Sequence, residues 1–545
     1  MADPTDNPYD PPSDVAMPHA EAAVASMPPP GQWMGHPTGL FYLFFAELWE
    51  RFSFYGMRAL LVLYCTQELF AGEADPKAFA YEIYAAYGAL VYFTPAIGGV
   101  LADRVIGHKN SIMLGAVLMT LGHFTMAFES QQIFYLSLGL LIIGNGFFKP
   151  NISSLVGGLY GEGDTRRDAG FTIFYLGINV GAFLAPLLCG WLGESFGWHY
   201  GFGLAGIGML AGLIVFGYGR SVGIYGGQGE QPPSTQEQFI AGINVRYWIY
   251  GAAFLAAPVF AFLVQQNSLN LLAGISGAPE FPLLGVLLWG LLLVVLGWII
   301  VQIITSDRVT RGRLAVIVVL TVLSTVFWAF FEQAGSSLTL FAKERVNLKL
   351  LTASMTNAIN PFYIMILAIP FSIMWQRLGN RSPRTIVKFS LGIWQLGLGF
   401  LVFAVSSRFM DDGDRVSMIF LLVGYLLITS GELFLSPIGL SKVTELSPAR
   451  LVAFMMGVWF LSSSFAHWIA GIIAKLTTGG GSDGAFANLA TGIIGRDVSQ
   501  TYGEGALQLF NYTSVFAQIA IVSFIVGLIA LLISPIVNRL SHGVH

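Results

Sequence analysis

Residues 47–58 read Glu-Leu-Trp-Glu-Arg-Phe-Ser-Phe-Tyr-Gly-Met-Arg, within an apolar segment long enough to cross a membrane as a helix. Counted from Glu47, the charged residues Glu50, Arg51 and Arg58 follow at three, four and eleven positions, so a helix places them on one face. A charge that faces lipid costs about 2.5–3.5 kcal/mol at the bilayer centre on insertion scales. We therefore expect these side chains to line a water-filled cavity or to pair with other buried charges.

The composition of the chain is typical of a membrane protein. Of its 545 residues, 55% are hydrophobic and 11% are charged, whereas soluble domains carry about 25% charged residues. This deficit and the recurrence of apolar runs of about 20 residues predict an all-α polytopic membrane protein. The two cysteines, Cys65 and Cys189, lie in apolar segments, so the sequence indicates neither a disulfide framework nor a metal site.

The hydropathy pattern predicts fourteen transmembrane helices. The predicted spans are residues 39–66, 79–101, 111–129, 132–157, 170–191, 198–218, 247–266, 282–305, 314–341, 356–376, 385–405, 416–440, 452–475 and 512–536. An even number places both termini on one side, and the loops of that side hold sixteen Lys and Arg residues against eight on the other. Because basic residues concentrate in cytoplasmic loops, we expect cytoplasmic termini and a multi-pass protein of the inner (plasma) membrane.

The spans divide the chain into four parts. Residues 1–37, rich in Pro, Asp and Ala, predict a disordered N-terminal tail without a signal peptide. Residues 38–220 predict an N-terminal six-helix bundle, and residues 308–540 predict a C-terminal six-helix bundle. Residues 221–307 predict a Gly- and Pro-rich cytoplasmic linker and an inserted pair of lipid-facing spans that contain no Asp, Glu, Lys or Arg.

The loop after the second span reads Gly-Val-Leu-Ala-Asp-Arg-Val-Ile-Gly-His-Lys over residues 99–109. It resembles the loop between the second and third helices of the major facilitator superfamily. The resemblance implies that Asp103 and Arg104 pair near a helix end in a structural or gating role, while the glycines let helices cross closely. Taken alone, the two residues also fit an ordinary solvated loop.

Three further ionisable residues lie in apolar runs. Lys149 lies in the fourth span, Glu332 in the ninth and Glu432 in the twelfth. Each alone could belong to a structural ion pair that locks two helices together. The whole set, divided between two bundles, favours a transport pathway, because static packing does not need so many costly groups.

Several segments resemble the signatures of the proton-dependent oligopeptide transporter (POT/PTR) family, in its bacterial form. Residues 47–56 resemble the first-helix signature Glu-x-x-Glu-Arg-Phe-x-Tyr-Tyr-Gly, and residues 174–181 match Phe-Tyr-x-x-Ile-Asn-x-Gly. The runs Phe-Lys-Pro, Phe-Trp-Ala-x-x-Glu-Gln and Glu-Leu-Phe-Leu-Ser-Pro-Ile-Gly-Leu also agree, in order, as far as about residue 460. The resemblance implies a major facilitator fold of two six-helix bundles plus an inserted helix pair.

The resemblance also implies a role for each matching position. Glu47, Glu50 and Arg51 correspond to the proton-coupling motif. Glu332 corresponds to an acid of the family's seventh helix, which is the ninth span of this chain because the inserted pair precedes it. That acid pairs with Arg58 when an outer gate closes. On position alone, the aromatic residues of the set equally fit core or interfacial packing. The substrate-binding positions implied are Arg58 and Lys149 for the peptide carboxylate, Glu432, Asn179 and Asn360 for the amino end, and Tyr55, Tyr92, Trp328 and Trp459 as pocket aromatics.

The chain departs from the family signature at Phe54, where the family usually has a tyrosine. A hydroxyl able to hydrogen-bond the peptide backbone is missing there, so we expect the substrate affinity and side-chain preference to differ from those of the family. The charged residues of the signature are all present. The second span has no histidine, and we therefore expect carboxylates to couple protons. His123 and His467 are expected to be packing or interfacial residues.

These roles predict a proton-coupled symporter that imports di- and tripeptides by alternating access. A zwitterionic peptide has an amine and a carboxylate, which basic groups on one bundle and an acid on the other bind across a midplane site. A carboxylate beside Arg51 stays ionised, and losing that partner favours its protonation. Protons are the coupling ion, no other cofactor or metal is expected, and a monomer is sufficient.

Two alternatives stay open on the sequence. One is a proton symporter of another small solute, such as nitrate or peptide-like drugs, on the same fold, and the other is a non-transporting membrane receptor. An enzyme is not expected, because the chain has neither a His-Glu-x-x-His run nor a Gly-x-Ser-x-Gly elbow. The expected partners are peptides and the lipid bilayer, without nucleic acid.

Overall fold

The computed structural model describes residues 31–161, 163–265, 282–349, 351–448, 451–479, 486–497 and 499–542. The helices are α2 (Thr38–Tyr64), α3 (Pro76–Leu101), α4 (His108–Met126), α5 (Gln131–Gly158), α6 (Arg167–Ala185), α7 (Trp191–Phe196), α8 (Trp198–Ser221), α9 (Pro233–Gln236), α10 (Val245–Gln265), α11 (Leu283–Thr305), α12 (Arg308–Phe331), α13 (Ser337–Arg345), α14 (Ile359–Leu378), α15 (Thr385–Val405), α16 (Ile419–Leu446), α17 (Val452–Lys475), α18 (Ala487–Ile494) and α19 (Glu504–Leu540).

Short turns and strands connect these helices. The π-helical turns are η1 (Cys65–Leu69), η2 (Ala102–Ile106) and η3 (Pro186–Gly190), and the 3₁₀ turns are η4 (Glu332–Gly335), η5 (Ser354–Ala358), η6 (Gly379–Arg381), η7 (Ser406–Phe409) and η9 (Leu476–Thr478). The two-residue strands pair as β1 (Gln32–Trp33) with β2 (His36–Pro37), β3 (Phe239–Ile240) with β4 (Ile243–Asn244), both antiparallel, and β5 (Val346–Asn347) with β6 (Val416–Ser417), in parallel.

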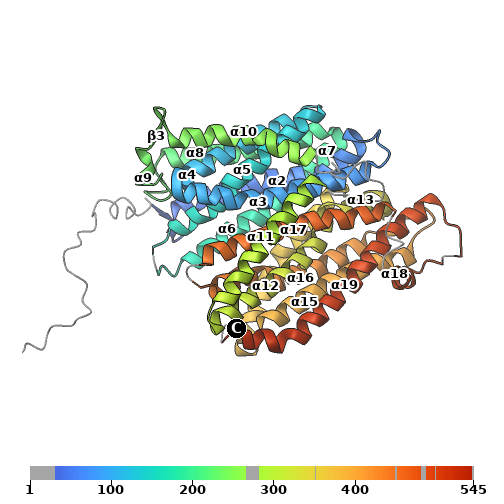
Figure 1. Ribbon diagram of the computed structural model, residues 1–545. Helices are drawn as coiled ribbons and strands as arrows, with labels where there is room; N and C mark the ends of the chain where they lie inside the picture. The colour runs from blue at the N-terminus through green and yellow to red at the C-terminus, as the bar shows by residue number, and fades with distance from the viewer. Residues whose placement is uncertain are drawn as a thin grey trace, which may run out of the picture.

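The long helices form two bundles, seen in Figure 1 as a blue-to-green upper half and a yellow-to-red lower half. In the first bundle α2 packs on α6 and α8, and α4 packs on α5; in the second, α15 packs on α16 and α19. The bundles meet where α3 lies against α17 and α6 lies against α14. We call the end of the molecule that carries α7, α13 and α18 the outer end, following the predicted orientation (Figure 1).

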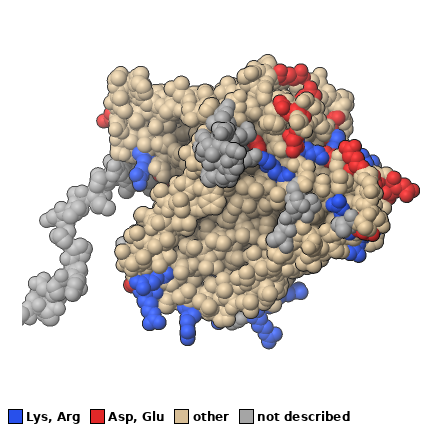
Figure 2. Space-filling model, turned by 45° about the vertical axis from the view of Figure 1, so that its right-hand side comes forward, with Lys and Arg blue, Asp and Glu red and all other residues tan. Residues whose placement is uncertain are grey.

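Eleven helices among the described residues are long and apolar enough to cross a membrane. A broad surface without charged side chains separates the basic lower edge of the molecule from the acidic and basic groups at its upper right in Figure 2. The three other predicted spans fall on α2, α4 and α16, of which α2 contains the four charges of residues 47–58. The all-α membrane fold is therefore confirmed, while the number fourteen stays a prediction.

The inserted pair corresponds to α10 and α11. Helix α10 lies along the first bundle against α5, and α11 lies against α12 and α17 (Figure 1). Both expose large apolar side chains, such as Leu255 and Leu293. This exposure fits a lipid-facing position.

Two predicted spans are interrupted helices in the structure. The span predicted at 314–341 consists of α12 and α13 joined by the 3₁₀ turn η4, which begins at Glu332. The span predicted at 170–191 consists of α6 and α7 joined by the π-helical turn η3, which begins at Pro186. A proline removes a backbone donor and disturbs the regular helix there, whereas periodicity alone did not indicate the first break.

The N-terminal tail was predicted to reach residue 37. Residues 1–30 of that prediction lie outside the described residues. Residues 31–37 carry the β1–β2 hairpin, and a hydrogen bond joins His36 Nδ1 to the Tyr160 hydroxyl (2.9 Å). Packed structure therefore begins a few residues before the predicted boundary.

Candidate functional site

The charged stripe of α2 faces the interior of the first bundle. The exposed fractions of Glu47, Glu50 and Arg51 are 3%, 0% and 4%. Helix α6 approaches α2 closely at Gly181, where a Cβ atom would lie 2.3 Å from the carbonyl oxygen of Leu48. Only glycine permits this approach. The stripe is therefore held away from lipid by close helix packing.

Arg51 joins the two carboxylates of the stripe. Its Nε lies 2.9 Å from Glu47 Oε1 and also contacts a carboxylate oxygen of Glu50. From α5, the Asn145 amide donates to Glu50 Oε1 (3.3 Å). Arg51 Nη2 and Glu47 Oε2 are buried without a hydrogen-bond partner among the described residues. Buried groups in this condition are uncommon in purely structural pairs, and they fit a site that exchanges protons or partners.

Phe54, the departure from the signature, lies beside this motif. The Arg51 guanidinium carbon is 5.7 Å from the centre of the Phe54 ring, within cation–π range. The same ring stacks near Tyr87 of α3, with centroids 6.4 Å apart. The absent hydroxyl therefore leaves an aromatic surface under the arginine.

An ion pair between Arg58 and Glu332 joins the two bundles. It runs from α2 to the start of η4, and both side chains are largely buried. Tyr84 of α3 completes the contact, because its hydroxyl accepts from Arg58 Nε (2.7 Å) and donates to Glu332 Oε2 (3.0 Å). The structure thus brings together the two residues that the resemblance implied as an outer gate.

His467 of α17 also contacts Glu332, with 3.4 Å between Nε2 and Oε2. Its Nδ1 lies 2.9 Å from the Ser463 carbonyl oxygen, which only accepts, so Nδ1 carries a hydrogen. A neutral ring then turns an unprotonated Nε2 toward the carboxylate, whereas the imidazolium donates to both oxygens. His467 was expected to be a packing or interfacial residue; it does pack, against the Tyr92 ring, but it also contacts the Glu332 carboxylate, which was not expected.

One signal could have identified part of this group. An imidazole within an apolar span belongs to the same costly class as the carboxylates already singled out, so His467 could have been included. The sequence offers no comparable signal for Tyr84, because its role depends on which faces of α2, α3 and η4 meet.

Lys149 lies near the same cluster. Its Nζ is 4.2 Å from the centre of the Tyr92 ring, and that ring stacks on His467 with centroids 4.6 Å apart. Lys149 is also within electrostatic range of Glu47 and Glu50. Tyr92 thus links a basic group of the first bundle to the inter-bundle contact.

The second bundle holds the other acid of the predicted site. Asn360 of α14 donates to Glu432 Oε2 (3.0 Å) and to the Thr429 hydroxyl (3.0 Å), both on α16. Glu432 is buried and lies within electrostatic range of Tyr175 on α6 and of Arg58 on α2. Asn179 differs, because its amide donates to the Tyr175 carbonyl oxygen within α6 (3.0 Å).

The remaining predicted aromatics lie at separate places. The Tyr55 ring centre is 5.8 Å from the Arg58 guanidinium carbon. Trp328 of α12 packs edge-on against Phe331 (5.0 Å between centroids), and Trp459 of α17 packs against α16 at Gly439. Of the four predicted pocket aromatics, Tyr55 and Tyr92 thus have ring contacts with basic residues of the site. For the two tryptophans, a pocket role stays a prediction.

Asp103 and Arg104 lie in η2, away from this cluster. Asp103 Oδ1 is 3.4 Å from His108 Nε2, and the described residues show no ion pair between Asp103 and Arg104. The pairing implied by resemblance is thus replaced by a contact with His108. A close helix crossing lies at Gly98, one residue before the quoted loop, where a Cβ atom would lie 2.0 Å from the Gly146 carbonyl oxygen, whereas Gly99 within the loop has only ordinary contacts.

Further polar contacts join the bundles at the outer end. Lys77 Nζ is 2.6 Å from Glu344 Oε2, and Lys475 Nζ is 2.6 Å from Glu82 Oε1. Glu194 of α7 accepts from Lys343 (3.0 Å) and from the Ser354 hydroxyl (2.6 Å). These contacts and the Arg58–Glu332 pair hold the outer end closed. The described residues contain no group of three or more His, Cys, Asp or Glu side chains placed to hold a metal ion.

Comparison with known proteins agrees with the family resemblance of the sequence. A sequence model of the POT family matches residues 109–489. The uncharacterized transporter YclF of Bacillus subtilis (strain 168) is 38% identical over 535 residues, which cover 96% of this chain and 99% of the relative. A di-/tripeptide transporter of Lactococcus lactis subsp. lactis (strain IL1403) is 36% identical over 479 residues, which cover 85% of this chain and 94% of the relative.

Solved structures give the same result. A crystal structure of peptide transporter POT in complex with sulfate has a TM-score of 0.78 and 35% sequence identity with this chain. The match covers 95% of this chain and 99% of that one. The two-bundle arrangement in Figure 1 is therefore shared over nearly the whole length of both chains.

Proposed function

The chain belongs to the POT family, and from this premise we propose that it is a proton-coupled symporter that imports di- and tripeptides by alternating access. The protein is a multi-pass membrane transporter of the major facilitator type. The substrate class follows from the arrangement of charge in the site.

One observation carries the proposal: each bundle presents an ionisable group that forms no direct ion pair among the described residues. Lys149 belongs to the first bundle and Glu432 to the second, and neither forms an ion pair with another described residue. A dipeptide supplies a carboxylate for the ammonium and an amine for the carboxylate. Binding both ends draws the bundles together around the substrate.

The state of Arg58 refines this assignment. Arg58 is engaged by Glu332 and Tyr84, so Lys149 is the group available to a peptide carboxylate while the outer end is closed. Opening that end separates Arg58 from Glu332 and makes the guanidinium available to an entering peptide. The resemblance gave both residues the peptide carboxylate and gave Arg58 a gating role as well, and these contacts support assigning the two residues to different stages of the cycle.

Proton coupling is assigned to the α2 stripe. A proton taken up by Glu47 or Glu50 removes a negative charge from Arg51, which then turns to another acceptor. The membrane potential contributes about 2.3 kcal/mol per charge per 100 mV and favours inward proton movement. Protons serve as the coupling ion without another cofactor, in an inner-membrane protein with cytoplasmic termini that is active as a monomer.

Uptake into proteoliposomes tests the proposal. We expect a labelled dipeptide to accumulate when the outside is acidic, and unlabelled di- and tripeptides to compete, whereas single amino acids and nitrate should not. Failure of any di- or tripeptide to accumulate or compete would reject the proposal. Competition by nitrate alone would instead support the rival symporter.

A further inference from the structure

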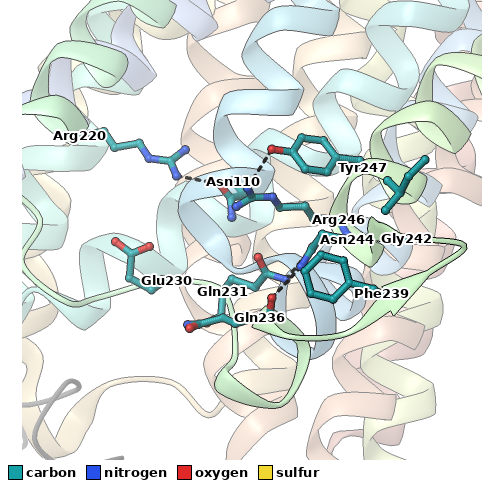
Figure 3. Close-up of a pocket in the computed structure, with 11 residues that line it drawn as sticks. Asn110, Arg220, Glu230, Gln231, Gln236, Phe239, Gly242, Asn244, Arg246 and Tyr247 are labelled. Atoms are coloured by element: carbon teal, nitrogen blue, oxygen red, sulfur yellow. Dashed lines mark hydrogen bonds between the residues drawn. The ribbon is translucent and has the colours of Figure 1, made fainter.

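A cavity of about 670 Å³ lies at the inner end of the first bundle, apart from the α2 and η4 charges. Its walls come from the start of α4, the end of α8, the linker and the start of α10 (Figure 3). Figure 1 shows β3 and α9 at this end, beside α4, α8 and α10. We call it the linker cavity.

The linker cavity contains two arginines without an acidic partner. Arg220 donates to Asn110 Oδ1 (2.7 Å), and Arg246 donates to the Tyr247 hydroxyl (2.9 Å), as Figure 3 shows. Arg246 Nε is buried and has no hydrogen-bond partner in the described part of the chain. Neither guanidinium forms an ion pair with a described residue, and both lie within electrostatic range of Tyr250.

The one carboxylate in the wall does not neutralise them. Glu230 Oε1 lies 2.6 Å from Lys109 Nζ, and the Lys109 side chain is nearly fully buried. Glu230 is therefore already paired, and the two arginines give the cavity a net positive charge. An anion with at least two acceptor oxygens satisfies such a pair of forked donors.

The rim of the linker cavity is apolar. The β3–β4 hairpin turns at Ala241 and Gly242, both with positive φ, as a tight two-residue turn requires. On it Phe239 is 60% exposed, and beside it on α10 Trp248 is 47% exposed. The Trp248 indole donates to the Ile240 carbonyl oxygen (3.0 Å) and so fastens the hairpin to α10. Exposed aromatic side chains at the end of a membrane helix are typical of the interface between head groups and acyl chains.

We propose that the linker cavity binds the phosphate of an anionic phospholipid from the cytoplasmic leaflet. Arg220 and Arg246 donate to the phosphate oxygens, and the acyl chains lie along the exposed apolar face of α10. Basic pockets between helix ends on the cytoplasmic side suit such head groups. The lipid then ties α4, α8 and the inserted helix α10 together through one anion.

Lipid titration of the purified full-length protein in detergent tests the assignment. Phosphatidylglycerol should raise the melting temperature and appear as a bound adduct in native mass spectrometry, whereas phosphatidylcholine with the same acyl chains should not. Inorganic phosphate at the same concentration should also fail, because it lacks acyl chains. These comparisons use the wild-type chain and do not depend on a folded variant.

Substitution then locates the site. Arg220→Gln/Arg246→Gln should weaken phosphatidylglycerol binding by about tenfold or more, since two charge-assisted hydrogen bonds are lost. Arg384→Gln removes an exposed guanidinium from the inner end of the second bundle and should leave binding unchanged. Equal binding of both lipids, an equal effect of inorganic phosphate, or full binding by the double variant would overturn the proposal.

Discussion

Three side chains converge on one oxygen of Glu332. Arg58, the Tyr84 hydroxyl and His467 Nε2 all contact Oε2, from α2, α3 and α17. Two of these groups come from the first bundle, and His467 comes from the second, like Glu332 itself. The carboxylate that pairs with Arg58 is therefore also contacted by a side chain of its own bundle.

We predict that His467→Phe raises the open-to-closed ratio at the outer end. Phenylalanine keeps a ring beside Tyr92 but loses the contacts of the imidazole nitrogens with Glu332 and with the Ser463 carbonyl oxygen. Glu332 then loses one of the three contacts at Oε2 that come from α2, α3 and α17, and spin-label distances across the outer end measure the difference.

His199→Phe provides the matched control. His199 lies near Glu129, outside the inter-bundle contact, so its replacement should leave the distances across the outer end unchanged. Distances in His467→Phe identical to those of the wild type would show that the imidazole contact does not contribute to closure.

For the α2 stripe, we predict that Glu47→Gln abolishes gradient-driven uptake and retains peptide exchange. The variant keeps a side chain of the same size beside Arg51 but cannot cycle between carboxylate and carboxylic acid. Counterflow of a labelled dipeptide, without a pH gradient, measures exchange separately from driven uptake. Coupled uptake at the wild-type rate, or loss of peptide binding with coupling intact, would contradict the role of Glu47.

At the scale of elements, closure depends on the ends of α3, α7, α13 and α17. Glu344 Oε2 of α13 lies 2.6 Å from Lys77 Nζ of α3 and accepts a hydrogen bond from the Tyr512 hydroxyl of α19 (3.1 Å). Pairs this exposed contribute about 0.2–1 kcal/mol each, so several together set the balance between closed and open. Their loss should shift the conformational equilibrium rather than unfold the protein.

We predict that Lys77→Glu raises the open-to-closed ratio by about 1.4- to 5-fold, the equivalent of one such pair. The reversed charge repels Glu344, and the double variant Lys77→Glu/Glu344→Lys restores attraction. Spin labels at the exposed positions Glu73 and Asn488 report the separation of the two bundles at the outer end. If the double variant stays as open as Lys77→Glu alone, the pair does not control closure.

At the scale of the whole molecule, hydropathy and charge were enough to predict two helical bundles with an inserted pair. Long apolar runs have few alternatives in a bilayer, because backbone groups must be satisfied within the helix. The break at η4 was not predicted, although residues 332–337 read Glu-Gln-Ala-Gly-Ser-Ser, a run of polar and small residues that can interrupt a helix. The hairpin at residues 31–37 escaped prediction because composition carries no information about the contact of His36 with Tyr160.

The site was predictable to the extent that its groups are costly in a membrane. Glu47, Glu50, Arg51 and Glu332 were identified in this way, and the structure places the first three in one cluster. Contacts that depend on packing between distant segments were not predictable, such as that of Tyr84 with Glu332. The linker cavity could not be predicted from the sequence either, because it forms only where α8, α10 and the linker meet.

The most direct test of coupled transport is proton movement driven by peptide alone. Proteoliposomes at equal pH on both sides, with a pH-sensitive dye inside, receive an inward gradient of dipeptide under a clamped membrane potential. We predict internal acidification that depends on the dipeptide and is absent in Glu47→Gln. Dipeptide entry at the same rate without acidification in the wild type would contradict proton–peptide symport.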